Sequence, residues 1–178
     1  MKKIETLLFL TCSVIVLSLW LAACSDDDKN ERKDLLQGSW NIDQAVAIAP
    51  PVENATMTKE QLETVFNNYT FFEQGSEITF VDDTVKLVAT FGDVELPMKL
   101  PYTFEKDTLT ITAAASPTVT FEIKGAVDFY TSHFELNLTD KSYMSILQFV
   151  VLLTQEPNLQ NALSQTQQAH ASYNLVKK

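Results

Sequence analysis

The residues best suited to acid–base or metal chemistry are two histidines, His133 and His170, which stand far apart in a chain of 178 residues. Neither belongs to a metal-ligand or nucleophile motif, so we expect both at the surface. Ser39 lacks the G-x-S-x-G setting of a nucleophile, and Asp82–Asp83 falls at an expected turn. A pair of acidic residues that hydrolyses glycosides remains an alternative, because the fold, and not the spacing in the sequence, brings such residues together. We therefore predict a protein that is not an enzyme and that uses no cofactor or metal.

Cys24 has the clearest chemistry in the chain. It ends an apolar run, residues 7–23, which follows two lysines near the start and is typical of a secretory signal peptide. The residues Leu21-Ala22-Ala23-Cys24 resemble the lipobox of bacterial lipoproteins. This resemblance implies cleavage after residue 23 and lipidation of the Cys24 sulfur. A permanent transmembrane anchor is the alternative, since the run is at the short limit of about 17–20 apolar residues for crossing a bilayer.

An acidic stretch follows the cysteine, and residues 24–34 are expected to be a flexible tether because they have little apolar surface to bury. Its start resembles the export signal of surface-exposed lipoproteins of Bacteroidetes. The residues that match are Ser25, Asp26, Asp27 and Asp28. The resemblance implies display at the cell surface from the outer membrane. A plain spacer that leaves the protein on the periplasmic face is the alternative.

Charge and cysteine content exclude some partners and sites. The net charge of −10 repels phosphate backbones, so we expect no nucleic-acid partner. Cys12 lies in the expected signal peptide and Cys24 is expected to be lipidated. The remaining domain therefore has no thiol for a disulfide or a cysteine-ligated zinc.

Residues 35–178 are expected to form one mainly β domain. Trp40, Ile42, Val46 and Ile48 alternate and predict a first strand with one buried face. A capping box at Thr58 opens an early helix. From residue 77 apolar and polar residues alternate for about sixty residues, which predicts an antiparallel meander of strands.

Turns in this meander are expected at Asp82–Asp83, at 105–108 and at 125–128. Pro97 and Pro101 on the fourth arm indicate an edge or a bend. A buried helix over 142–153, a helix from Pro157 and a last strand over 172–178 follow. The total of about eight strands suits a closed barrel.

Gly38-Ser39-Trp40 resembles the G-x-W signature of lipocalins, in which the tryptophan closes one barrel end. The order of elements resembles a lipocalin-like family of Bacteroidetes lipoproteins. Lipocalins usually place an arginine against the tryptophan, but the one arginine here, Arg32, precedes the first strand. Lys177 is the expected substitute. Trp40 as an ordinary core aromatic is the alternative.

Strand parity places a set of large side chains on the expected inner face. These candidates for lining a ligand cavity are Phe80, Phe91, Met98, Tyr102, Phe104, Phe121, Tyr130 and Phe134. We predict that they line a pocket in which this envelope protein binds a small apolar ligand, with Tyr102 and Tyr130 supplying hydroxyl groups. The alternative is that they fill the barrel, which would leave its exterior to bind a protein partner in the envelope.

Two expected turns are followed by "DTV" and "DTL", which resemble the O-glycosylation acceptor of Bacteroidetes. This resemblance makes Thr84 and Thr108 candidate acceptors at exposed hairpin ends. The alternative is that aspartate and threonine simply favour turns and strand starts.

Overall fold

The computed structural model describes the backbone of residues 27–91, 94–116 and 119–178, and the side chains of residues 32–89, 95–114 and 120–178. The chain divides into two compact units, Met1–Leu36 and Gln37–Lys178. The boundary lies two residues beyond the position expected from the sequence.

The described part of the first unit is one helix, α2, Asp27–Leu36. A flexible tether was expected over 24–34, and the described part of that segment, from Asp27 onward, has helical backbone. The helix starts with aspartates and has Lys33 in its last turn, which is the charge order that complements the helix dipole. Cys24, Ser25 and Asp26 lie outside the described residues.

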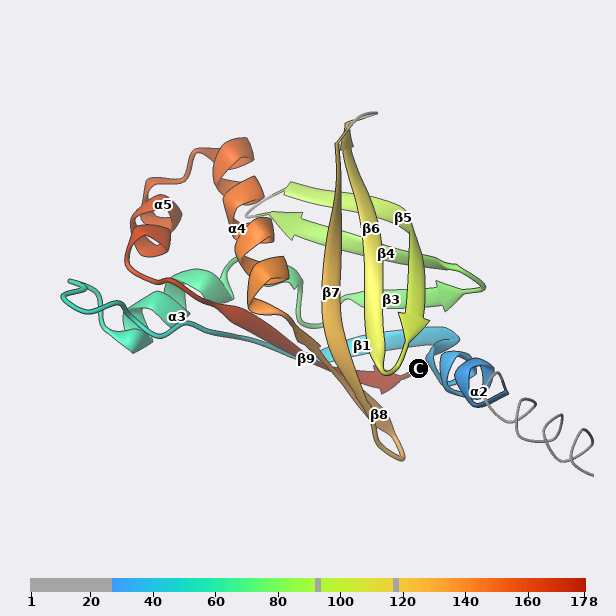
Figure 1. Ribbon diagram of the computed structural model, residues 1–178. Coiled ribbons are helices and arrows are strands. Elements are labelled where there is room, and N and C mark those ends of the chain that lie inside the picture. Colours follow the sequence, from blue (N-terminus) through green and yellow to red (C-terminus); the bar gives the residue numbers. More distant parts are fainter. Residues whose placement is uncertain (1–26, 92–93, 117–118) are drawn as a thin grey trace, which may run out of the picture. The chain divides into compact units, whose positions relative to one another are not determined.

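Eight strands of the second unit close into one antiparallel barrel, which confirms the predicted mainly β, lipocalin-like fold class (Figure 1). Around the barrel the strand order is β4-β3-β1-β9-β8-β7-β6-β5, and β5 pairs back to β4. Each barrel strand therefore pairs with the next one in the chain, and the last strand, β9, also pairs with the first, β1. A two-residue strand, β2 (Phe71–Phe72), also pairs with β4. The bounds are β1 Gly38–Ile48, β3 Glu77–Val81, β4 Thr84–Phe91, β5 Val94–Glu105, β6 Thr108–Ser116, β7 Val119–Phe129, β8 His133–Leu138 and β9 His170–Lys177.

A register shift in β1 corrects the expected face of the first strand. Trp40 and Ile42 are buried as expected, but the pairing of β1 with β9 slips between Ile42 and Gln44. A bulge of this kind exchanges the two faces beyond it. Ala47 is consequently the buried residue, and the expected Val46 and Ile48 are only half-buried.

The expected turn at 125–128 is also wrong, because β7 runs straight through it to Phe129. Gly125 is needed here for close packing rather than for a turn. A Cβ at this position would lie 2.7 Å from Leu136 Cδ1 and 2.9 Å from the Asn137 backbone oxygen. The turn comes after Phe129 instead. The other two turns are found where they were expected, with positive φ at Asp82, Lys106 and Asp107.

The prolines of β5 coincide with a change of partner. Residues 94–101 pair with β4, whereas Tyr102–Glu105 pair with β6. Figure 1 shows β5 curving between these two halves. Within the described residues, the first half of β5 is not paired with β6. Pro97 thus lies beside an open edge and Pro101 at the bend.

Three helices lie together on one side of the barrel (Figure 1). Helix α3, Lys59–Asn67, has the predicted capping box at Thr58. Helices α4, Asp140–Thr154, and α5, Pro157–Ser164, form the expected pair before the last strand. Among the residues that the structure describes, no helix is both long and apolar enough to span a bilayer.

Candidate functional site

Trp40 is a buried aromatic residue near the start of β1, and its closing of one barrel end stays a prediction. Gly38, two residues earlier, has a φ of +110°, which glycine adopts without strain. The Trp40 ring is 5% exposed and packs edge-on against Phe134 at 4.7 Å between centroids. Lys177 pairs with Trp40 across β1 and β9, and its Nζ lies 5.3 Å from the centroid of the indole ring. The lysine therefore occupies the place that the lipocalin resemblance gives to an arginine, as a cation over an aromatic ring.

Four of the candidate lining residues form a packed aromatic core beneath Trp40. Phe80 and Phe134 are 1% and 0% exposed, and Tyr102 and Phe104 are buried as well. The Phe80 ring lies 5.2 Å from Tyr102 and 6.4 Å from Phe134, in edge-to-face geometry. Side chains around a ligand cavity would leave surface accessible to water inside it. Phe80 and Phe134 leave almost none, so they fill this part of the barrel.

The hydroxyl of Tyr102 also has a structural role. Gln37 Nε2 donates a hydrogen bond to Tyr102 Oη at 2.8 Å. The Gln37 amide oxygen accepts from the backbone of Asp82, which ties the first residue of this unit to the β3–β4 turn. The hydroxyl therefore helps to hold the start of the barrel in place.

Tyr130 does not lie on the inner face. It follows the end of β7, is 53% exposed and stacks on His133 at 4.6 Å. The error comes from the misplaced turn at 125–128, which changed the parity by one residue. Phe129 takes the expected place, at 5.9 Å from Phe104 and 5.8 Å from Phe134. An unbroken alternation from Phe121 to Phe129 was the signal for it in the sequence.

Of the other three candidate lining residues, two are only half-buried and the side chain of the third is not described by the structure. Met98 and Phe121 share the inward parity of their strands but are half-buried. The Phe121 ring packs on Phe149 of α4 at 5.7 Å. The side chain of Phe91 lies outside the described residues.

Two tyrosines that the sequence did not single out are buried beside the helices. Tyr143 Oη donates to the Phe66 backbone oxygen at 2.9 Å, and burial raises the pKa of Tyr143 above its usual value. Tyr173 is 1% exposed and packs on Phe72 at 5.0 Å. Burial, and then the neighbouring Tyr143, raise the pKa of Tyr173 well above its usual value, while the backbone of Phe72 partly opposes the shift. Among the described residues, Tyr173 Oη has no partner in hydrogen-bond geometry.

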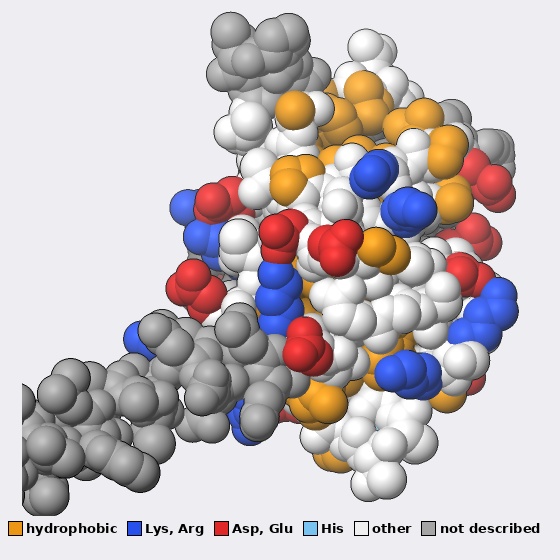
Figure 2. Space-filling model, turned by 90° about the vertical axis from the view of Figure 1, so that its right-hand side faces the viewer, with side chains coloured by type: hydrophobic (Ala, Val, Ile, Leu, Met, Phe, Trp, Pro, Cys, Tyr) orange, Lys and Arg blue, Asp and Glu red, His pale blue; other side chains and the backbone are white. Residues whose placement is uncertain are grey.

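Two surface hollows have the size of small-molecule sites, which is about 300–1,000 Å³. One, of about 410 Å³, lies between the β6–β7 hairpin and the start of α4 and has a polar lining that includes Thr120, Glu122 and Ser145. The other, of about 460 Å³, is a groove over β3, β4 and β5 that includes Val88 and Pro97. On the face shown in Figure 2, hydrophobic side chains lie in patches between lysines and acidic residues. That face therefore has no large field of one charge.

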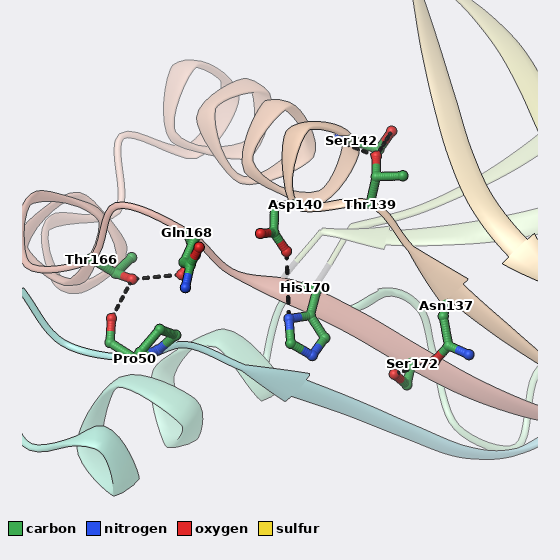
Figure 3. Close-up of polar contacts among 9 residues, drawn as sticks. All are labelled: Pro50, Asn137, Thr139, Asp140, Ser142, Thr166, Gln168, His170 and Ser172. Atoms are coloured by element: carbon green, nitrogen blue, oxygen red, sulfur yellow. Dashed lines mark hydrogen bonds and ion pairs between the residues drawn. The ribbon is translucent and has the colours of Figure 1, made fainter.

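The histidines do not share a site. His170 Nδ1 lies 3.5 Å from Asp140 Oδ1, in a contact that links β9 to the first turn of α4 (Figure 3). Ser172, two residues further along β9, is instead bonded to Asn137 at 2.6 Å between Oγ and Oδ1. His133 lies at the opposite end of the sheet, under Tyr130.

The candidate acceptor threonines are both at strand starts after two-residue turns. Thr84 opens β4 after Asp82–Asp83, and Thr108 opens β6 after Lys106–Asp107. Both side chains are half-buried. Their glycosylation stays a prediction.

Comparison with known proteins finds no relative of this chain. No family model matches it, and neither the curated proteins nor the solved structures contain a match. The barrel itself, with eight antiparallel strands and helices before the closing strand, is consistent with a lipocalin-like fold.

Proposed function

We propose that this chain is a lipid-anchored protein of the bacterial cell envelope, with a filled barrel whose outer surface binds a protein partner. The lipobox motif ending at Cys24 supports the anchor, and the acidic residues after it support an outer-membrane position exposed at the cell surface. The alternative position is the periplasmic face. An acyl chain contributes about 0.8 kcal/mol per buried methylene, so several chains on one cysteine give stable anchoring.

The packed aromatic core is the observation that favours a filled barrel. Trp40, Phe134, Phe129 and Phe104 form a continuous series of ring contacts through the interior. The two hollows described above lie on outer surfaces instead. A rigid barrel with its interior occupied can still present a defined exterior to another macromolecule.

A small apolar ligand is the second candidate, and one observation favours it. The first half of β5 is not paired with β6 in the described residues, and Met98 is only half-buried there. A ligand would then bind at this opening rather than deep in the barrel, because the core beneath Trp40 is full.

Mass spectrometry of protein purified from its own membranes tests both parts of the proposal. We expect the intact mass to include lipid on the chain from Cys24, with further mass only if Thr84 and Thr108 carry glycans, and no stoichiometric small molecule on solvent extraction. An extracted apolar compound at one per chain would overturn the filled barrel and favour the second candidate.

Cys24→Ala tests the anchor separately. We expect an uncleaved precursor that is not labelled by a fatty-acid analogue, because the sulfur that accepts the lipid is gone. Normal processing and labelling of this variant would contradict the lipidation. Replacing Asp26, Asp27 and Asp28 by alanine then tests display, through the access of protease to the protein on intact cells. Unchanged access would reduce the acidic stretch to a spacer.

A further inference from the structure

The cleft between the β6–β7 hairpin and the start of α4 is the described hollow with the most polar lining. Its volume is about 410 Å³, and hydroxyl groups enter it from both walls. We propose that this cleft binds a saccharide. This function goes beyond partner binding and does not depend on the lipid anchor.

Contacts between β7 and α4 join the two walls of the cleft. The Lys124 backbone amide donates to Ser142 Oγ at 2.8 Å, and the Thr139 amide donates to the Lys124 carbonyl at 2.9 Å. Thr139 and Ser142 are seen together at the start of α4 in Figure 3. The Phe121 ring also rests on Phe149. A site fixed in this way loses little conformational freedom when a ligand binds.

The lining has the donors and acceptors that a polyhydroxylated ligand requires. Glu122 Oε2 lies 2.7 Å from Lys124 Nζ, and both side chains are about half exposed. The carboxylate accepts hydrogen bonds from sugar hydroxyls, and the ammonium group donates to them. Further hydroxyls come from Thr112, Thr120 and Ser145. Phe121, which is half-buried, also lines the cleft and adds an apolar component to it.

The same lining disfavours other classes of ligand. An apolar molecule would take Glu122 and Lys124 out of water without offering them hydrogen bonds, which is costly for charged groups. A phosphate would meet the Glu122 carboxylate and the net charge of −10. A neutral sugar meets neither penalty.

The test is an NMR titration of the purified full chain in a zwitterionic detergent that contains no sugar. Glucose, galactose, N-acetylglucosamine and mannose, which are all neutral, are each added to about 50 mM, which reaches millimolar affinities. We expect at least one of them to give saturable shifts of the backbone amides of Thr120, Glu122 and Ser145. Absence of saturable shifts with all four sugars, or saturable shifts confined to other parts of the barrel, would overturn the proposal.

Two variants and a matched control assign the binding to the cleft. Glu122→Gln keeps the shape of the side chain and removes its charge, so we expect about a tenfold weaker Kd. Phe121→Leu keeps an apolar contact with Phe149 and removes the aromatic ring, so binding should also weaken. Glu105→Gln, at an exposed position at the end of β5, should leave the Kd unchanged.

The exposed Glu122 position keeps the test decisive if Phe121→Leu fails to fold. Equal affinity of Glu122→Gln and Glu105→Gln would contradict the proposal. The lipid anchor and the filled core are tested by labelling and extraction, so their failure is distinguishable from failure of sugar binding.

Discussion

Phe134→Ala should separate a filled barrel from an open one. Phe134 is 0% exposed, and its ring contacts Trp40 at 4.7 Å, Phe129 at 5.8 Å and Phe80 at 6.4 Å between centroids. Truncation of a fully buried phenylalanine lowers the free energy of unfolding by about 3–5 kcal/mol. Each aromatic pair adds about 0.5–1.5 kcal/mol beyond the buried area, so we expect the upper part of this range. That loss is a large share of the about 5–15 kcal/mol that stabilises a typical domain.

Urea unfolding followed by tryptophan fluorescence measures this loss, because Trp40 is in direct contact with the substituted ring. Tyr130→Ala is the matched control on the same hairpin. Its ring is 53% exposed, so its loss should cost about 1 kcal/mol or less. A loss below about 1 kcal/mol for Phe134→Ala with an unchanged slope in urea would refute the packed core. It would mean that the ring borders open space in the barrel.

Three further predictions concern single positions. Gly125→Ala should lower the free energy of unfolding by about 1–3 kcal/mol, because the added Cβ would lie 2.7 Å from a leucine of β8; urea unfolding measures this, and Ala126→Ser on the exposed face should have no effect. The raised pKa of Tyr173 keeps its proton in the folded state, so stability should fall as the pH rises above about 10, where unfolded tyrosines ionise. Tyr173→Phe should reduce this fall. It should also raise the free energy of unfolding by about 1 kcal/mol at neutral pH, since it removes a buried hydroxyl without a described partner. Lower stability of this variant in urea would contradict this and indicate that the hydroxyl has a hydrogen-bond partner. If Thr84 and Thr108 are glycosylated, the intact mass of native protein should exceed that of polypeptide plus lipid, and their double substitution by valine should remove the excess.

Periodicity predicted the barrel well because most of its strands are regular. Phe80, Tyr102, Phe104 and Phe134 were assigned correctly to the interior, since each lies on a strand that alternates without interruption. The place of Lys177 over Trp40 followed from the family resemblance, not from the pattern of the strand.

The errors in the sequence analysis concern the register of β1 and a turn expected within β7. The bulge after Ile42 shifts the parity of β1 and leaves no trace in hydrophobic alternation. At Gly125 the parity does not change, and the error came from expecting a turn where β7 continues to Phe129. Gly125 looked like a turn residue because its need for close packing depends on Leu136, which only the fold brings near. The polar cleft was missed for a similar reason, because Glu122 and Ser145 come from a strand and a helix that meet only in the folded chain.

The position of β9 has a consequence for how this protein is made. It follows every other strand in sequence, yet it is the strand that joins β1 to β8. The pairing of Trp40 with Lys177 therefore waits until almost all of the domain has been synthesised. Contacts between distant parts of a chain form slowly, because a long loop must close first. A chain that is still emerging keeps two unpaired strand edges, and this unclosed form is vulnerable to aggregation until β9 arrives.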